Sequence, residues 1–133
     1  LPAMARRLDP DGFVAAPHFA QGVLVPPGMA TLYVAGQVAG DDPDGLGGID
    51  VTAQTHATVD RVEAILAAAG MEPADLVQIS AHLTDRAHVG AYRAVLRARW
   101  GDVRPAAKLV ISPLVDPRYL VEIAAVAARA MPA

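Results

Sequence analysis

Residues 119–127 read YLVEIAAVA, a run whose only charged side chain is that of Glu122. A long apolar run of this kind predicts a buried β-strand. An unpaired carboxylate in such a strand would cost several kcal/mol or shift its pKa and become neutral, so Glu122 needs partners, water or a chemical role. Two interpretations stay open. Glu122 is either a paired structural glutamate or a carboxylate that holds a water molecule in a pocket.

The length of the chain fits one domain, and we expect residues 1–133 to form it. Met4 is expected to be the natural start, with Leu1–Ala3 as additional residues in front of it. Hydrophobic residues make up 53% of the sequence and aromatic residues only 5%. This apolar share is high for so small a chain, so we expect a second surface to be buried by self-association.

Composition also limits the partners. The formal net charge is −3, which argues against a nucleic-acid-binding protein with a broad basic surface. The chain has no cysteine, so disulfides and thiolate chemistry are excluded. No apolar stretch approaches the roughly 20 residues of a membrane span. We therefore expect no membrane partner and a cytoplasmic protein.

Two helices are predicted from spacing and capping residues. Asp50 is a good N-cap for a helix that ends at Gly70, and its apolar positions recur at helical spacing at Thr55, Val59, Val62, Ile65, Leu66 and Ala69. Asp85 caps a second helix that ends at Gly101, with a core face of Val89, Tyr92, Val95, Leu96 and Trp100. Arg93 and Arg97 lie on its polar side.

The remaining segments predict strands. Residues 76–84 alternate with period two, and residues 108–112 and 119–130 are further strands. Residues 23–25 and 31–35 flank Pro26-Pro27-Gly28 and are predicted to pair as a hairpin, followed by a loop over residues 41–48. The order β-β-α-β-α-β-β predicts an α+β fold, in which both helices cover one face of a mixed sheet. The other face then meets solvent or another subunit.

A series of short motifs in a fixed order covers nearly the whole chain. They are Phe19-Ala20-Gln21-Gly22, Tyr33-Val34-Ala35-Gly36-Gln37, Gln54, Ala68-Ala69-Gly70-Met71, His82-Leu83-Thr84-Asp85, Pro105-Ala106-Ala107 and residues 121–127. In this order they resemble the Rid superfamily of reactive intermediate deaminases, also called the YjgF or L-PSP family. The resemblance implies a chorismate-mutase-like fold and a homotrimer with a small-molecule pocket at each subunit interface.

The resemblance also assigns roles within that pocket. Glu122 matches the family's glutamate that positions the attacking water, and Gly36 matches a glycine whose backbone lines the pocket. Phe19 stands in place of a tyrosine, so a hydroxyl is absent at this position. Leu109 is a further residue expected to contact the substrate.

The chain differs from the deaminase branch at the position that binds the substrate's carboxylate. Ala107 stands where that branch has an arginine, whose planar guanidinium can make two parallel hydrogen bonds to a carboxylate. Lys108 cannot simply replace it, because successive strand side chains point to opposite faces. Arg93, in place of a family asparagine, is either a new clamp or a solvated surface charge.

Histidine and serine side chains are further candidates for catalytic chemistry. His82 is either a hydrogen-bonded interface histidine or a second acid–base group that contacts the substrate. The four histidines have no metal-ligand spacing, and His56 lies on a polar helix face, so neither metal nor cofactor is expected. No serine lies in a motif with histidine and aspartate partners.

Three functions remain open. The first is hydrolysis or transformation of a small imine, enamine or related carbonyl compound, with Glu122 positioning water. Ala107 argues against the standard 2-aminoacrylate deaminase, although another hydrolase or deaminase activity is compatible. The second is non-catalytic binding of a small metabolite by the trimer. The third is ribonuclease activity, which the acidic charge balance disfavours.

Overall fold

A four-stranded mixed sheet forms the centre of the protein in the computed structural model, which describes residues 4–40 and 50–131. Its strands are β3 (Met29–Gln37), β4 (Leu76–Leu83), β5 (Ala106–Ile111) and β6 (Val121–Ala130). Their order across the sheet is β3-β6-β4-β5, with β6 antiparallel to both neighbours and β4 parallel to β5. The run around Glu122 is thus a central strand, as its sequence predicts.

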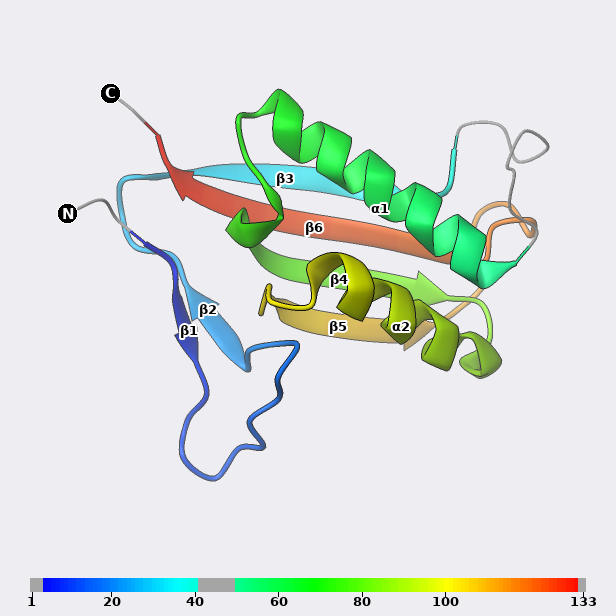
Figure 1. Ribbon diagram of the computed structural model, residues 1–133, viewed down its shortest axis with the longest axis horizontal. Helices are drawn as coiled ribbons and strands as arrows, with labels where there is room; N and C mark the ends of the chain where they lie inside the picture. Colours follow the sequence, from blue (N-terminus) through cyan, green and yellow to red (C-terminus); the bar gives the residue numbers. More distant parts are fainter. Residues whose placement is uncertain (1–3, 41–49, 132–133) are drawn as a thin grey trace.

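Helices α1 (Val51–Ala68) and α2 (Val89–Trp100) both lie on one face of this sheet. Figure 1 shows α1 over β3 and β6, and α2 over β4 and β5. Between helices and sheet lies one apolar core, whose largest fully buried members include Leu66, Leu76, Leu83 and Ile123. The α+β fold with both helices on one face is confirmed.

The helix ends follow the capping residues. The Asp50 carboxylate accepts a hydrogen bond from the Ala53 amide at 2.8 Å, and Gly70 takes a φ of 71° just after α1. That positive φ strains any residue with a Cβ, so glycine suits this turn. Asp85 caps a short 3-10 turn, η3 (Arg86–His88), that leads directly into α2. No helix within residues 4–40 and 50–131 combines the length and the apolar character needed to cross a membrane.

Gln54 fixes the approach to β6. Its side chain is buried in α1, yet its amide nitrogen donates to the Arg118 carbonyl at 3.0 Å and its amide oxygen accepts from the Leu120 amide at 2.8 Å. Buried polar groups persist when they are hydrogen-bonded in this way. The segment just before β6 is therefore held to α1, which sets where Glu122 begins to cross the sheet.

Within residues 4–40 and 50–131, no helix covers the opposite face of the sheet. Along β6, Val121, Ile123 and Ala125 are buried toward the helices, whereas Glu122, Ala124 and Val126 alternate onto the open face and are partly exposed. Tyr33 pairs with Val126 across β3 and β6 and is 78% exposed. We call this surface, which contains Tyr33 and Glu122, the open face.

The predicted hairpin of residues 23–25 with residues 31–35 is wrong. Strand β2 (Gly22–Leu24) pairs instead with β1 (Arg6–Leu8) in a separate two-stranded sheet, while β3 pairs with β6. Pro26 and Pro27 lack amide donors, and Gly28 has a φ of 91°, so the chain turns away between the two strands rather than closing a hairpin. The predicted loop over residues 41–48 lies outside the described residues.

Candidate functional site

The carboxylate of Glu122 lies against the backbone of Gly36. A Cβ added to Gly36 would stand 2.7 Å from Glu122 Oε2 and 2.9 Å from its Cδ, so no side chain fits here unless Glu122 moves. The sheet register explains the approach: Val34 pairs with Ala125 and Gln37 with Ile123, which leaves one extra residue in β3. This is a β-bulge, a feature that often re-aims backbone beside active sites.

Gln37 stabilises the bulge from the buried side. Its amide nitrogen donates to the Ala35 carbonyl at 3.0 Å, and its amide oxygen accepts from Arg61 Nε at 3.1 Å. The side chain of Gln37 is itself buried. The backbone on which the Glu122 carboxylate rests is therefore held in place by hydrogen bonds of its own.

His82 lies beside Glu122 on the open face, because the two residues are direct partners in the β4–β6 ladder. Side chains of such partners stand about 4.5–5.5 Å apart at Cβ. On its other side, His82 Nδ1 is hydrogen-bonded to Ser112 Oγ at 3.0 Å. Glu122, His82 and Ser112 thus form a row across β6, β4 and the end of β5.

Ser112 was not predicted as a site residue. The signal was present in the alternation of residues 108–112, which places Val110 and Ser112 on the same side of the strand. A local Ser-His-Asp motif does not reveal Ser112, because its contact with His82 joins residues thirty positions apart through the pairing of β4 with β5.

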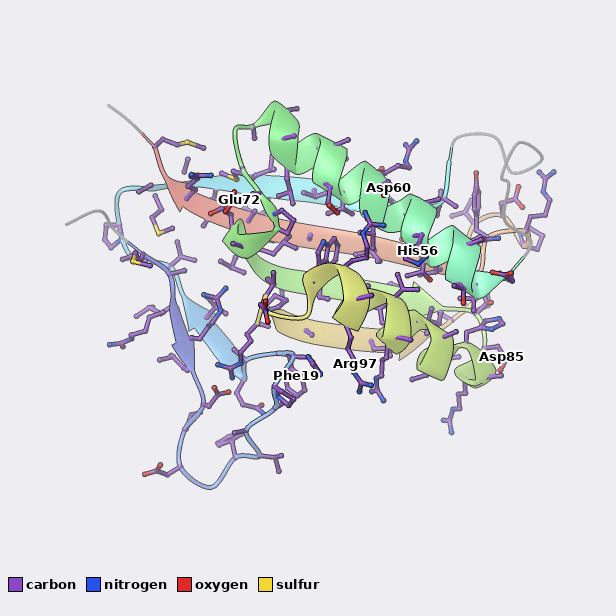
Figure 2. All side chains as sticks on the ribbon, in the orientation of Figure 1. Phe19, His56, Asp60, Glu72, Asp85 and Arg97 are labelled. Atoms are coloured by element: carbon purple, nitrogen blue, oxygen red, sulfur yellow. The ribbon has the colours of Figure 1, made fainter. Side chains whose placement is uncertain are left out.

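A cavity of about 580 Å³ lies on the other side of the sheet, between α2 and β5. Phe19, Arg93, Ala107 and Leu109 all line it, together with Arg97. Figure 2 shows Phe19 and Arg97 at the same edge of the molecule, below α2. We call this cavity the α2 pocket.

The floor of the α2 pocket is apolar. Ala107 pairs with Ile79 in the parallel β4–β5 ladder, so both face the helices, and Tyr92, Leu96 and Trp100 close the space from α2. Alanine at position 107 contributes only a methyl group to the floor. Burial raises the pKa of Tyr92 well above its usual value of 10.0, so its phenol stays protonated at neutral pH.

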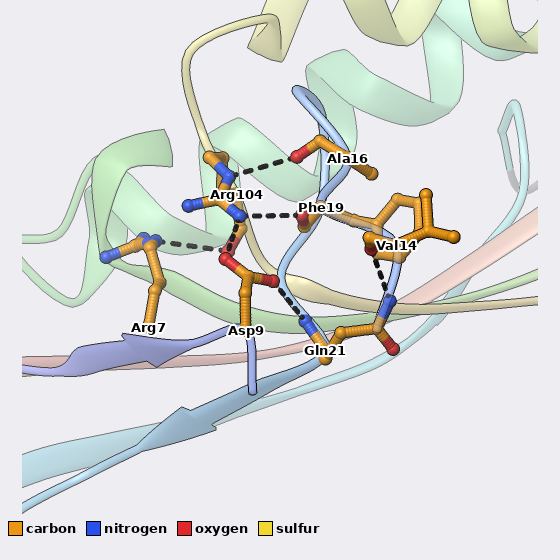
Figure 3. A network of polar contacts seen from close by, with 7 residues as sticks. All are labelled: Arg7, Asp9, Val14, Ala16, Phe19, Gln21 and Arg104. Atoms are coloured by element: carbon orange, nitrogen blue, oxygen red, sulfur yellow. Dashed lines mark hydrogen bonds and ion pairs between the residues drawn. The ribbon is translucent and has the colours of Figure 1, made fainter. Parts of the chain in front are cut away.

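Arg104 holds the N-terminal wall of the α2 pocket in place (Figure 3). Its guanidinium donates to the Ala16 carbonyl at 3.3 Å, to the Phe19 carbonyl at 3.2 Å and to the Asp9 carboxylate. Asp9 in turn accepts from the Gln21 amide at 3.1 Å. The hydrogen bond from Arg104 is the main cause that lowers the pKa of Asp9 below 3.8.

The predicted site residues thus form two groups. Phe19, Arg93, Ala107 and Leu109 line the α2 pocket, whereas Gly36, His82 and Glu122 belong to the open face. Because Ala107 faces the helices and Glu122 faces away from them, one chain does not bring the two groups together.

Another polar cluster lies outside both groups. Arg99 on α2 binds Asp60 at 2.6 Å, Glu63 at 2.9 Å and His56 Nδ1 at 3.2 Å, all on α1 (Figure 2). Arg99 therefore joins the two helices, and His56 is part of this contact. Within residues 4–40 and 50–131, no group of three or more histidines and carboxylates is placed to hold a metal ion.

Comparison with known proteins agrees with this architecture. Residues 12–129 match the family model described as Endoribonuclease L-PSP. The crystal structure of YyfB from Yersinia pestis, a Rid-family protein of unknown function, is similar with 30% identity and a TM-score of 0.78, over 92% of this chain and 97% of that one. Rv2704 from Mycobacterium tuberculosis, of the YjgF/YER057c/UK114 family, is similar with 29% identity and a TM-score of 0.65, over 82% and 85% of the two chains. The chain therefore belongs to the Rid/YjgF superfamily that the L-PSP family model describes.

Proposed function

We propose that this protein hydrolyses a small imine, enamine or related carbonyl compound at a site assembled between two subunits of a homotrimer. The observation that carries the proposal is the contact of the Glu122 carboxylate with the bulged backbone at Gly36. This contact aims a carboxylate at a surface where backbone donors and a water molecule can meet a substrate. The resemblance of the sequence to the reactive intermediate deaminases favours the same reaction class, whereas the matching family model is described as an endoribonuclease.

The reaction needs one water molecule and no redox partner. The Glu122 carboxylate accepts a proton as the water oxygen attacks the C=N carbon, and the π electrons move to nitrogen, which takes up a proton. The C–N bond of the resulting carbinolamine then breaks. Ammonia leaves and a carbonyl compound remains, so the sum is imine plus water to carbonyl plus ammonia.

His82 is the second acid–base group in this proposal. It neighbours Glu122 on the open face and its Nδ1 is hydrogen-bonded to Ser112, which leaves Nε2 available. An imidazole can carry a proton to the departing nitrogen near neutral pH. Ser112 acts through His82 and is therefore a positioning residue.

The placement of the two groups supports assembly of the site between subunits. The α2 pocket and the Glu122 row lie on opposite sides of one sheet, so a second copy is needed to bring a pocket to a carboxylate. The exposed Tyr33 beside Val126 gives the open face an apolar surface for such a copy. A ring of three subunits satisfies every site at once.

Release of ammonia from 2-imino acids tests the proposal. The imino acids are generated in situ by an amino-acid oxidase, and the native protein is compared with Glu122→Gln, which keeps the shape and removes the charge. We expect the native protein to accelerate release and the variant to lose most of this effect. No acceleration by the native protein with any imine or enamine tested would overturn the proposal.

Metabolite binding without catalysis is the second candidate. It is favoured by Ala107, which leaves the α2 pocket without the carboxylate clamp of the deaminase branch. In that case the native protein and Glu122→Gln would bind a ligand equally and neither would turn it over.

Ribonuclease activity is a third candidate, favoured by the basic side chains of Arg93 and Arg97 along the α2 pocket. The net charge of −3 opposes it. Binding to single-stranded RNA at low salt, followed by cleavage, would support this candidate, and absence of binding there would dispose of it.

A further inference from the structure

We propose that the α2 pocket binds organic anions that carry a large apolar group, with that group beneath α2 and the anionic head at the basic side chains of Arg93 and Arg97. The inference names the substrate class of the proposed function and rests on it for the reaction, but not for binding. It implies that imines derived from amino acids with aromatic or long apolar side chains are preferred to small ones.

The size and lining of the pocket support a bulky ligand. Its volume of about 580 Å³ is within the range typical of small-molecule sites. Ile79, Leu96, Trp100 and Leu109 present apolar surface, and Ala107 adds only a methyl group where a longer side chain would take up space. Burial of apolar ligand surface against these side chains favours binding.

The charges support an anion. Arg93 and Arg97 are four residues apart on α2, so they lie on the same helix face, where like charges repel. Neither arginine forms an ion pair with any residue in 4–40 or 50–131. No acidic residue is among those described as lining the pocket. A ligand carboxylate would relieve this uncompensated charge.

Tyr92 adds a hydrogen-bond donor inside the pocket. Its side chain is more than nine-tenths buried, and its hydroxyl has no hydrogen-bond partner among the described residues. The Tyr92 hydroxyl oxygen is not fully enclosed by other protein atoms, so it remains in contact with open space. A polar group on the ligand can accept from it, which a dry apolar pocket alone would not offer.

This arrangement reverses the orientation implied for arginine-bearing relatives. At the position of their carboxylate clamp, Ala107 gives this chain an apolar floor, while the cations Arg93 and Arg97 lie on α2. The apolar part of the ligand therefore occupies the floor, and the carboxylate lies toward the arginines of α2. Both positions are set by side chains of a single chain.

Trp100 makes the binding measurable, since it is the single tryptophan of the chain and lines the α2 pocket. The probes are 3-phenylpropanoate, propanoate as the small anion, and 3-phenylpropanol as the neutral molecule of the same shape. Binding is followed by tryptophan fluorescence excited at about 295 nm and by calorimetry on the full-length protein. We expect 3-phenylpropanoate to bind at least about tenfold more tightly than either comparison molecule.

Variants test the contribution of the arginine charges and that of the apolar floor separately. The double change Arg93→Gln and Arg97→Gln should weaken 3-phenylpropanoate about tenfold and leave 3-phenylpropanol within about twofold. Arg86→Gln, in η3 and outside the residues that line the pocket, is the matched control and should change neither. Ala107→Leu fills the floor and should weaken both phenyl ligands.

Equal affinities for 3-phenylpropanoate and propanoate, or for the anion and the alcohol, would overturn the inference. The proposed function fails separately. If 3-phenylpropanoate binds as expected but no imine is hydrolysed, the pocket assignment stands and the reaction is wrong. If Glu122-dependent hydrolysis occurs without preference for bulky imines, the reaction stands and the substrate class is wrong.

Discussion

The Glu122 carboxylate lies directly over the Cα of Gly36, with Oε2 only 2.7 Å from where a Cβ would be. This contact exists because β3 bulges by one residue opposite β6. A glycine is needed there for space, not for an unusual φ, since the positive φ values among the described residues belong to other glycines. The pair couples the backbone of β3 to the one carboxylate side chain of β6.

Gly36→Ala should therefore displace the carboxylate rather than unfold the protein, because the group that must move is the end of a flexible side chain. We expect turnover to fall roughly 10- to 100-fold, as for a misplacement near 1 Å, with little change in thermal stability. The measurement is kcat for imine hydrolysis beside a thermal melt. Ala35→Gly, one residue earlier in the same bulge, is the matched control. A Gly36→Ala variant with native kcat would show that the contact does not position Glu122.

Ser112→Ala removes the hydrogen bond to His82 Nδ1. A single hydrogen bond contributes about 1 kcal/mol net, so we expect kcat to fall a few-fold with KM almost unchanged. Ser112→Thr retains a hydroxyl and should recover most of the loss. If Thr and Ala behave alike while the fold is intact, Ser112 does not orient His82.

Arg99→Met should lower the free energy of unfolding by about 1 kcal/mol, because the guanidinium joins α2 to Asp60 and Glu63 of α1 while remaining partly exposed. Added salt should reduce the difference in unfolding free energy between Arg99→Met and the native protein. Arg97→Met is the control on the same helix, and it forms no ion pair with the described residues, so it should stay within about 0.5 kcal/mol. Urea unfolding at low and high salt measures both.

Acid should weaken the wall of the α2 pocket through Asp9. Its pKa is lowered in the folded protein, chiefly by the hydrogen bond from Arg104, so its stabilising contribution is complete above about pH 3.8 and is lost as pH falls through the lower folded value. The melting temperature of Asp9→Asn should lie below that of the native protein at pH 7 and 5, and the two should converge as the pH falls below 3.8. A constant gap across this range would contradict the assignment.

Much of the fold can be predicted locally. Asp50 and Asp85 mark both helix starts, and the alternation of residues 76–84 identifies β4, because capping and side-chain period are properties of neighbouring residues. The β1–β2 pairing could not be predicted in this way. Three-residue strands carry little pattern, and the partner of β2 lies more than ten residues upstream.

The site was predictable as a set of residues but not as an arrangement. Periodicity places Ala107 and Lys108 on opposite sides of β5, which the register with Ile79 and Ser80 bears out. The two-residue alternation of a strand does not reveal which face of the sheet the helices cover. The separation of Ala107 from Glu122 can therefore be deduced only once the order of the strands is known. The contact of Ser112 with His82 likewise depends on β4 and β5 being neighbours.

In the proposed function, each site combines the α2 pocket of one subunit with the Glu122 row of another. The most direct measurement mixes subunits of Glu122→Gln and Ala107→Phe, unfolds and refolds them together, and assays imine hydrolysis. Each variant alone should be inactive, and an equal mixture should recover about a quarter of native activity, because a pocket from the first variant meets Glu122 from the second in about that share of sites. An inactive mixture, in which native mass spectrometry shows mixed trimers, would contradict the account.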